Sequence, residues 1–181
     1  MMTAKPTNLE GVWLIEPPRW VDHRGAIAQI WNRADYIDCR LAHGLPHPQW
    51  PESREWVQDN VTFSVENVLR GVHGYDDLWR LCSCLYGDIY FVVVNCDERN
   101  ADFGKHEAFK LHCPSPMVLV PPKFGIAFLT RSVRSIFSYR WSGYFEDRQQ
   151  FAFLYDDLRF GIKWPENSKD FILSDRDASC L

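Results

Sequence analysis

The stretch Leu78-Trp-Arg-Leu-Cys-Ser-Cys-Leu-Tyr-Gly-Asp-Ile-Tyr-Phe-Val-Val-Val94 reads as two β-strands that are separated by a turn at residues 86–88. It is rich in β-branched and aromatic residues, which favour extended backbone. Similar short apolar runs are predicted strands at residues 12–15, 26–31, 57–65, 107–111, 117–120, 126–130, 135–140 and 151–154. Short strands at this spacing are typical of antiparallel sandwiches and barrels, so we predict an all-β fold.

Few segments outside these runs have a helical pattern. Residues 33–43 are predicted to form a helix, with Gly44 as its stop signal. The proline-rich segment 46–51 is predicted to be a loop, and the polar tail 165–177 is predicted to be irregular. No internal repeat or compositional break divides the chain, so we expect residues 1–181 to form a single domain.

Composition excludes several classes of function. The chain has 20 basic and 24 acidic residues, giving a net charge of −4 without a basic block, which argues against nucleic-acid binding. It lacks an 18-residue apolar run and a signal peptide, so we expect no membrane association and a cytoplasmic location. The six cysteines form no CxxC motif and are expected to be reduced thiols.

One histidine stands out by its neighbours. His73 follows a glycine-flanked turn and lies between Arg70 and Arg80, just ahead of the two strands. Imidazole accepts a proton near neutral pH, and guanidinium holds a phosphate or a developing oxyanion. The positions two before and two after His73 are Gly71 and Tyr75, so the paired histidines of a metal site are missing. Nucleophile-elbow and phosphate-loop glycine patterns are also missing.

Six motifs in order resemble the dTDP-4-dehydrorhamnose 3,5-epimerase family across residues 10–177. They are Gly11-Val-Trp-Leu-Ile-Glu-Pro-Pro18, Asp22-His-Arg-Gly25, Trp56-Val-Gln-Asp-Asn60, Asn67-Val-Leu-Arg-Gly-Val-His73, Gly161-Ile-Lys-Trp-Pro165 and Leu173-Ser-Asp-Arg-Asp177. The resemblance implies a cupin-like jelly roll (a double-stranded β-helix) with few short helices. It also implies a homodimer without metal or organic cofactor that acts on a nucleotide-linked 4-keto-6-deoxy sugar.

The resemblance assigns the catalytic roles. Loss of a proton from C3 or C5 of a 4-keto sugar gives an enolate, so inversion needs a base, an acid on the opposite face and a group that holds O4. His73 matches the family's base, Asp177 the carboxylate that orients it, and Tyr139 the acid. Arg80 falls where the family usually has lysine beside the sugar oxyanion, and guanidinium keeps the charge without donating a proton.

The resemblance also assigns substrate-binding positions around the nucleotide. These are Arg24, Gln29, Gln58, Asn60, Arg70, Tyr144, Phe145 and Arg176. The arginines and amides match positions that hold phosphates and base, and one of the two aromatic residues matches the ring that stacks on the base.

Several positions depart from the family pattern. Ile126 replaces a histidine, Gln29 a glutamate and Ile27 a phenylalanine, and Gln150 lies near another usual glutamate. The loop after His73 is also short. These departures affect substrate contacts, so the chemistry is expected to be kept while the nucleotide (dTDP, GDP or CDP) and the sugar differ. The short loop and Trp79-Arg-Leu81 resemble the subgroup that acts on GDP-linked keto-heptoses.

Three alternatives stay open at this point. One is a 3-epimerase that inverts a single carbon, and another is a 3,4-ketoisomerase on the same scaffold. The third is a nucleotide-sugar-binding cupin without activity, which the replacements at Arg80 and Ile126 suggest.

Overall fold

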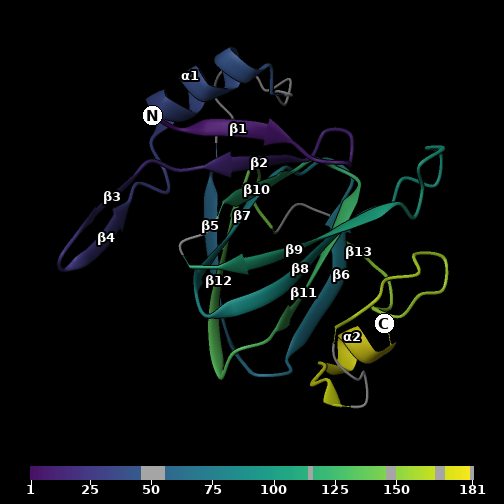
Figure 1. Ribbon diagram of the computed structural model, residues 1–181. Coiled ribbons are helices and arrows are strands. Elements are labelled where there is room, and N and C mark those ends of the chain that lie inside the picture. Colours follow the sequence, from purple (N-terminus) through teal and green to yellow (C-terminus); the bar gives the residue numbers. More distant parts are fainter. Residues whose placement is uncertain (46–55, 114–115, 146–149, 166–169, 180–181) are drawn as a thin grey trace.

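The computed structural model describes residues 1–45, 56–113, 116–145, 150–165 and 170–179, and within them the chain folds mainly as two antiparallel sheets (Figure 1). The first sheet contains, in spatial order, β1 (Thr3–Pro6), β2 (Trp13–Glu16), β10 (Met117–Val120), β7 (Arg80–Tyr86), β12 (Arg134–Trp141) and β5 (Gln58–Val65). The second contains β13 (Gln150–Ala152), β6 (Leu69–Tyr75), β11 (Phe124–Thr130), β8 (Asp88–Asn95) and β9 (His106–His112). A separate hairpin is made by β3 (Arg19–Asp22) and β4 (Gly25–Ala28).

The main hydrophobic core lies where the two sheets face each other. Phe137 of the first sheet contacts Phe91 and Phe128 of the second, with ring centroids 5.4 and 4.5 Å apart. Cys82 and Cys84, two residues apart on β7, are both buried in this core, as a shared strand face requires. Burial of these large side chains is the main term that holds the sheets together.

Parts of the outer faces of both sheets are covered as well. The helix α1 (Arg33–His43) contributes Tyr36 and Cys39 to a cluster over the first sheet. Aromatic residues of the C-terminal segment, such as Phe160 and Trp164, pack over the second sheet against Val92. Strand β8 is therefore buried on both faces, which explains its continuous apolar run.

Most predicted elements are confirmed, including the all-β class. The helix over residues 33–43 has the predicted bounds, Asn32 caps its start, and Gly44 adopts the left-handed conformation at its end. Residues 22–25 form the turn that joins β3 to β4. Strands β1, β3 and β6 were not predicted, and the loop predicted at 46–51 lies outside the described residues.

Two predictions about local structure are wrong. His73 does not follow a turn but lies within strand β6, where Gly74 pairs with β11 and β13, and Gly71 lies at a β-bulge between the paired residues Arg70 and His73. The tail is not wholly irregular, because α2 (Asp175–Ser179) begins after Ser174. The hydroxyl of Ser174 accepts a hydrogen bond from the backbone N–H of Asp177 at 3.1 Å, which is the interaction of a helix N-cap.

Neither helix in the described residues is long and apolar enough to cross a membrane.

Candidate active site

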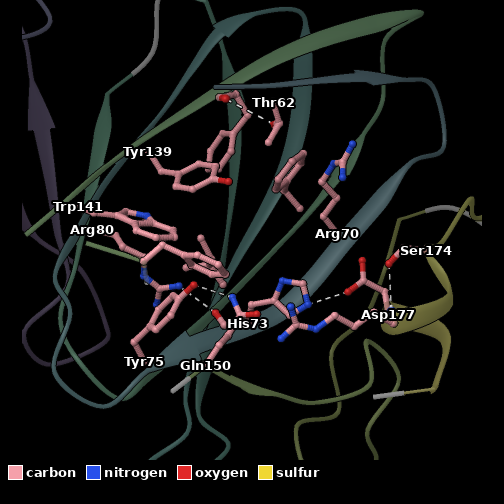
Figure 2. Close-up of a pocket in the computed structure, with 15 residues that line it drawn as sticks. Thr62, Arg70, His73, Tyr75, Arg80, Tyr139, Trp141, Gln150, Ser174 and Asp177 are labelled. Atoms are coloured by element: carbon pink, nitrogen blue, oxygen red, sulfur yellow. Dashed lines mark hydrogen bonds and ion pairs between the residues drawn. The ribbon is translucent and has the colours of Figure 1, made fainter. Parts of the chain in front are cut away.

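A cavity of about 270 Å³ opens between the two sheets, and Figure 2 shows the side chains that line it. Its lining comprises Thr62, Arg70, His73, Tyr75, Arg80, Ile126, Phe128, Phe137, Tyr139, Trp141, Phe145, Gln150, Ser174, Arg176 and Asp177. Seven of the predicted site residues are in this set: His73, Tyr139, Asp177, Arg80, Arg70, Phe145 and Arg176.

A β-bulge sets which side chains of β6 face the cavity. Residues three apart on a regular strand point to opposite faces. The register of β6 against β11 shifts between the pairs His73–Ile126 and Arg70–Phe128, so β6 holds one extra residue there. Arg70 and His73 therefore both line the cavity, together with Tyr75, which lies two residues beyond the histidine.

His73 and Asp177, 104 positions apart in the sequence, meet at this cavity. Nε2 of His73 lies 2.6 Å from Oδ1 of Asp177, and the carboxylate side chain is only 5% exposed (Figure 2). A carboxylate at this place holds the ring proton on Nε2, so Nδ1 of the neutral ring is left to accept another proton.

The carboxylate keeps its charge despite its burial. Burial alone raises the pKa of Asp177, but the hydrogen bond and charge of His73, together with Ser174 and the backbone of Gly71, bring this pKa below its usual value. An ionised Asp177 stabilises an imidazolium at position 73, so the pair is equipped for general base catalysis.

Tyr139 comes from the opposite sheet. It lies on β12 two residues from Phe137 and from Trp141, and all three line the cavity, as the alternation of a strand requires. Burial raises the pKa of the Tyr139 phenol, although the charges of Arg70 and Arg80 oppose this effect. The phenol is therefore protonated at neutral pH and can act as an acid facing the histidine's sheet.

Arg80 is a buried cation that contacts the backbone of His73. Its side chain is 2% exposed, its Nη1 donates to the carbonyl oxygen of His73 at 2.9 Å, and its Nη2 donates to the carbonyl oxygen of Phe124. Its Nε is buried without a hydrogen-bond partner among the described residues. The guanidinium thus anchors the backbone of the base and brings positive charge to the cavity.

A second cavity, about 690 Å³ in volume, adjoins the first. The two share Tyr139, Trp141 and Phe145, and the second is also lined by the predicted residues Gln58, Asn60 and Tyr144. The amide of Gln58 donates to Oδ1 of Asn60 at 2.9 Å and accepts from the backbone N–H of Phe145 at 3.1 Å. Polar amides beside exposed rings suit a planar ligand such as a nucleotide base.

Two predicted site residues do not reach either cavity within one chain. Arg24 lies at the tip of the β3–β4 hairpin, which projects away from the sheets in Figure 1, and its Nη2 is 2.6 Å from Oδ2 of Asp22. Gln29 follows β4, where its backbone N–H donates to the carbonyl oxygen of Pro18.

Several cavity residues were not predicted. They are Thr62, Tyr75, Phe128, Phe137, Trp141 and Ser174. The spacing of Ser174 and Asp177 matches a helix capping box and is a signal for the short helix. Alternation along β12 also indicates that Phe137 and Trp141 share the face of Tyr139.

Among the described residues, no group of three or more His, Cys, Asp or Glu side chains is arranged to hold a metal ion.

Comparisons with known proteins agree on one family. The model of the dTDP-4-dehydrorhamnose 3,5-epimerase family matches residues 6–181. The Escherichia coli K12 dTDP-4-dehydrorhamnose 3,5-epimerase is 30% identical, over 97% of this chain and 91% of that protein. The dTDP-4-dehydrorhamnose 3-epimerase of Streptomyces niveus is 27% identical, over 99% of this chain and 83% of that protein.

Solved structures lead to the same family. The Legionella pneumophila 3,5-epimerase in complex with dTDP-4-keto-L-rhamnose has a TM-score of 0.85 at 25% identity, covering 99% of this chain and 91% of that one. A 4-keto-6-deoxy sugar epimerase from the novobiocin gene cluster of Streptomyces spheroides has a TM-score of 0.84 at 26% identity, covering 99% and 86%. With its cupin-type fold, this chain belongs to the dTDP-4-dehydrorhamnose 3,5-epimerase family and is a nucleotide-sugar epimerase.

Proposed function

We propose that this enzyme inverts C3, C5 or both of a nucleotide-activated 4-keto-6-deoxy sugar, with His73 as the base and Tyr139 as the acid. The contact of 2.6 Å between His73 and Asp177, in a cavity that Tyr139 also lines, is the observation that carries this assignment. The base and the acid come from opposite sheets, as inversion of a carbon between them requires.

The reaction proceeds through an enolate. His73 removes the proton next to the ketone, and the electron pair of the C–H bond moves onto O4. The charge of Asp177 stabilises the resulting imidazolium, and the charge of Arg80 stabilises the oxyanion. Tyr139 then donates its proton to the opposite face of the carbon. Each acid or base typically contributes about 10²- to 10⁴-fold in rate.

Solvent exchange tests these roles. We expect His73→Asn to abolish deuterium incorporation from D₂O at both C3 and C5, because the base is lost. Tyr139→Phe is expected to block inversion while sparing exchange at one carbon. NMR of the sugar nucleotide measures both, and His112→Asn, at an exposed histidine of β9, is the matched control. Exchange at the wild-type rate in the His73 variant would refute the assignment.

A 3-epimerase that inverts one carbon is the second candidate. Relatives at 27% identity include the Streptomyces niveus 3-epimerase named above and a dTDP-4-dehydro-6-deoxyglucose 3-epimerase from Streptomyces bikiniensis. NMR of the product separates the two activities, because inversion at C3 alone leaves the coupling pattern at C5 unchanged.

The choice of nucleotide is a separate proposal. The link between β6 and β7 holds only residues 76–79, and this compact loop with Trp79-Arg-Leu81 supports a place in the subgroup that acts on GDP-linked keto-heptoses. We expect GDP to bind more tightly than dTDP or CDP in calorimetric titrations of the three nucleotides. Preference for dTDP would place the enzyme with the relatives that act on dTDP sugars.

We also propose a homodimer in which the β3–β4 hairpin of one copy completes the site of the other. Trp20, Val21 and Ile27 of the hairpin are 58%, 72% and 69% exposed. The edge strand β5 exposes Val61 and Phe63 on the face opposite to Asn60 and Thr62, which line the two cavities. An apolar hairpin laid along this edge would bury both surfaces and would bring Arg24 to the phosphates.

A further inference from the structure

The wall of the first cavity behind Arg80 carries a polar pair that the proposed mechanism does not use. It consists of Tyr75, at the end of β6, and Gln150, at the start of β13, which are cross-strand partners. The Nε2 amide of Gln150 donates to the Tyr75 hydroxyl at 2.8 Å, and Figure 2 shows this bond beside Arg80 and His73. Both side chains line the cavity.

The pair has unused hydrogen-bonding capacity. The Tyr75 hydroxyl oxygen accepts from Gln150, so its own hydrogen is left to donate. Oε1 of Gln150 is buried and has no hydrogen-bond partner among the described residues. If the amide is turned the other way, the phenol donates to Oε1, leaving the phenol oxygen as acceptor and Nε2 as donor. In either orientation the pair offers one donor and one acceptor side by side.

The tyrosine is held in place and remains a donor. Its side chain is 1% exposed, and its ring centroid lies 5.2 Å from that of Trp141. The guanidinium carbon of Arg80 lies 5.9 Å from the centroid of the same ring. Burial raises the pKa of Tyr75 above its usual value, although the charge of Arg80 opposes this. The phenol is therefore protonated at neutral pH.

The ligand group that matches such a pair is a hydroxyl, because it accepts one hydrogen bond and donates another. The pair lies in the cavity of His73 and Asp177, whereas Gln58, Asn60 and Tyr144 line the adjoining cavity that we assign to the nucleotide. A sugar bound in the first cavity would therefore place the end that is far from the nucleotide against the Tyr75–Gln150 pair.

We propose that Tyr75 and Gln150 select substrates by binding the C3 hydroxyl of the sugar. This inference rests on the proposed function, since it takes the first cavity as the site of the sugar. A built hydrogen-bonding site rejects an analogue without the hydroxyl, because the buried donor and acceptor are then left unpaired.

Binding of unreactive sugar nucleotides tests this selection. dTDP-6-deoxyglucose and its 3-deoxy analogue lack the ketone and are not epimerised. The matching GDP or CDP compounds replace them if the nucleotide titrations favour that base. We expect the 3-deoxy analogue to bind wild-type enzyme about 10-fold or more weakly than the parent sugar nucleotide. Tyr75→Phe, which keeps the ring, is expected to bring this ratio close to one, and so is Gln150→Leu.

Tyr90→Phe is the matched control, since the Tyr90 hydroxyl donates to the carbonyl oxygen of Lys163 outside the cavity. It should keep the wild-type selectivity. Equal binding of the two sugar nucleotides to wild-type enzyme would overturn the inference, because water then satisfies the pair equally well. Selectivity that persists in the folded Tyr75 and Gln150 variants would overturn it too. If no sugar nucleotide binds and no proton exchange occurs, the proposed function itself fails, and this inference with it.

Discussion

At the scale of single residues, one contact gives the site its chemistry. His73 is 24% exposed at the cavity, whereas its partner Asp177 is almost fully buried at 5%. The imidazole of His73 can therefore meet substrate, whereas the carboxylate of Asp177 is kept from water. In the proposed mechanism, the pair moves a proton between carbon and imidazole without changing the charge of Asp177.

Asp177→Asn removes the charge while keeping an oxygen that can accept from Nε2. We expect the epimerisation rate to fall by about 10²- to 10⁴-fold, because the imidazolium loses its counter-charge. Substrate binding should change little. A coupled assay for kcat and calorimetry for binding measure the two effects, and a variant with unchanged kcat would contradict the role of Asp177.

The same carboxylate predicts a pH dependence of stability. The pKa of Asp177 in the folded protein lies below its ordinary value of 3.8. A lowered pKa means that ionised Asp177 stabilises the fold above pH 3.8, and that this contribution is lost as pH falls through the folded-state pKa. We expect the difference in free energy of unfolding between wild type and Asp177→Asn to be constant at neutral pH and to shrink below pH 3.8. Urea unfolding at a series of pH values checks this, and a difference that grows in acid would contradict it.

At the scale of elements, short connections place the functional side chains. The four-residue link between β6 and β7 brings Tyr75 and Arg80, five positions apart, into one cavity from two different sheets. The link is anchored by Leu78, which is fully buried against Tyr75 and Trp141. The turn between β7 and β8 makes the next crossing between the sheets and depends on Gly87, whose φ is 82°.

Gly87→Ala is expected to destabilise the fold by several kcal/mol, because the new Cβ would collide with the carbonyl oxygen of Arg134. Gly44→Ala is the matched control, since its φ is 66° but nothing lies within 4 Å of the added Cβ. The control should lose only about 1–2 kcal/mol, the backbone strain of a left-handed alanine. Urea unfolding compares them, and equal losses would show that the collision costs nothing.

At the scale of the whole molecule, a single chain leaves Arg24 far from the cavity that it is predicted to serve. The hairpin that carries Arg24 projects from the sheets and exposes apolar side chains (Figure 1). The second, nucleotide-end cavity is bordered by β5, the edge strand of the first sheet. The proposed exchange of hairpins between two copies joins these features.

Mixing two inactive variants tests the exchange. His73→Asn lacks the base, and Arg24→Ala lacks the cation, yet a mixed dimer would contain one site with both residues intact. We expect a refolded one-to-one mixture to recover about one quarter of wild-type activity, because half of the dimers are mixed and each has one complete site. Light scattering should show two chains per particle. No recovery in a mixture that is dimeric would mean that Arg24 serves its own chain or no site at all.

Much of the fold and part of the site can be predicted from local sequence. The helix 33–43 has a cap at each end, and the strands around Cys82 and Val92 have strong β character, so local preferences alone place them. Family motifs identify His73, Tyr139 and Asp177. Strand β6 is missed because its two glycines resemble a turn, and only the pairing of this strand with β11 and β13 shows that the chain continues as a strand there. Tyr75 is missed because local sequence does not show which face of that strand meets the cavity.

Residue types and their order along the chain are enough to predict the all-β class, the helix 33–43 and the family. Tertiary structure alone decided which distant groups touch. The bulge in β6 turns Arg70 and His73 to one side, and the short C-terminal helix carries Asp177 to the imidazole. Such contacts depend on strand register and on sheet packing, which are set by many side chains together and not by any local pattern.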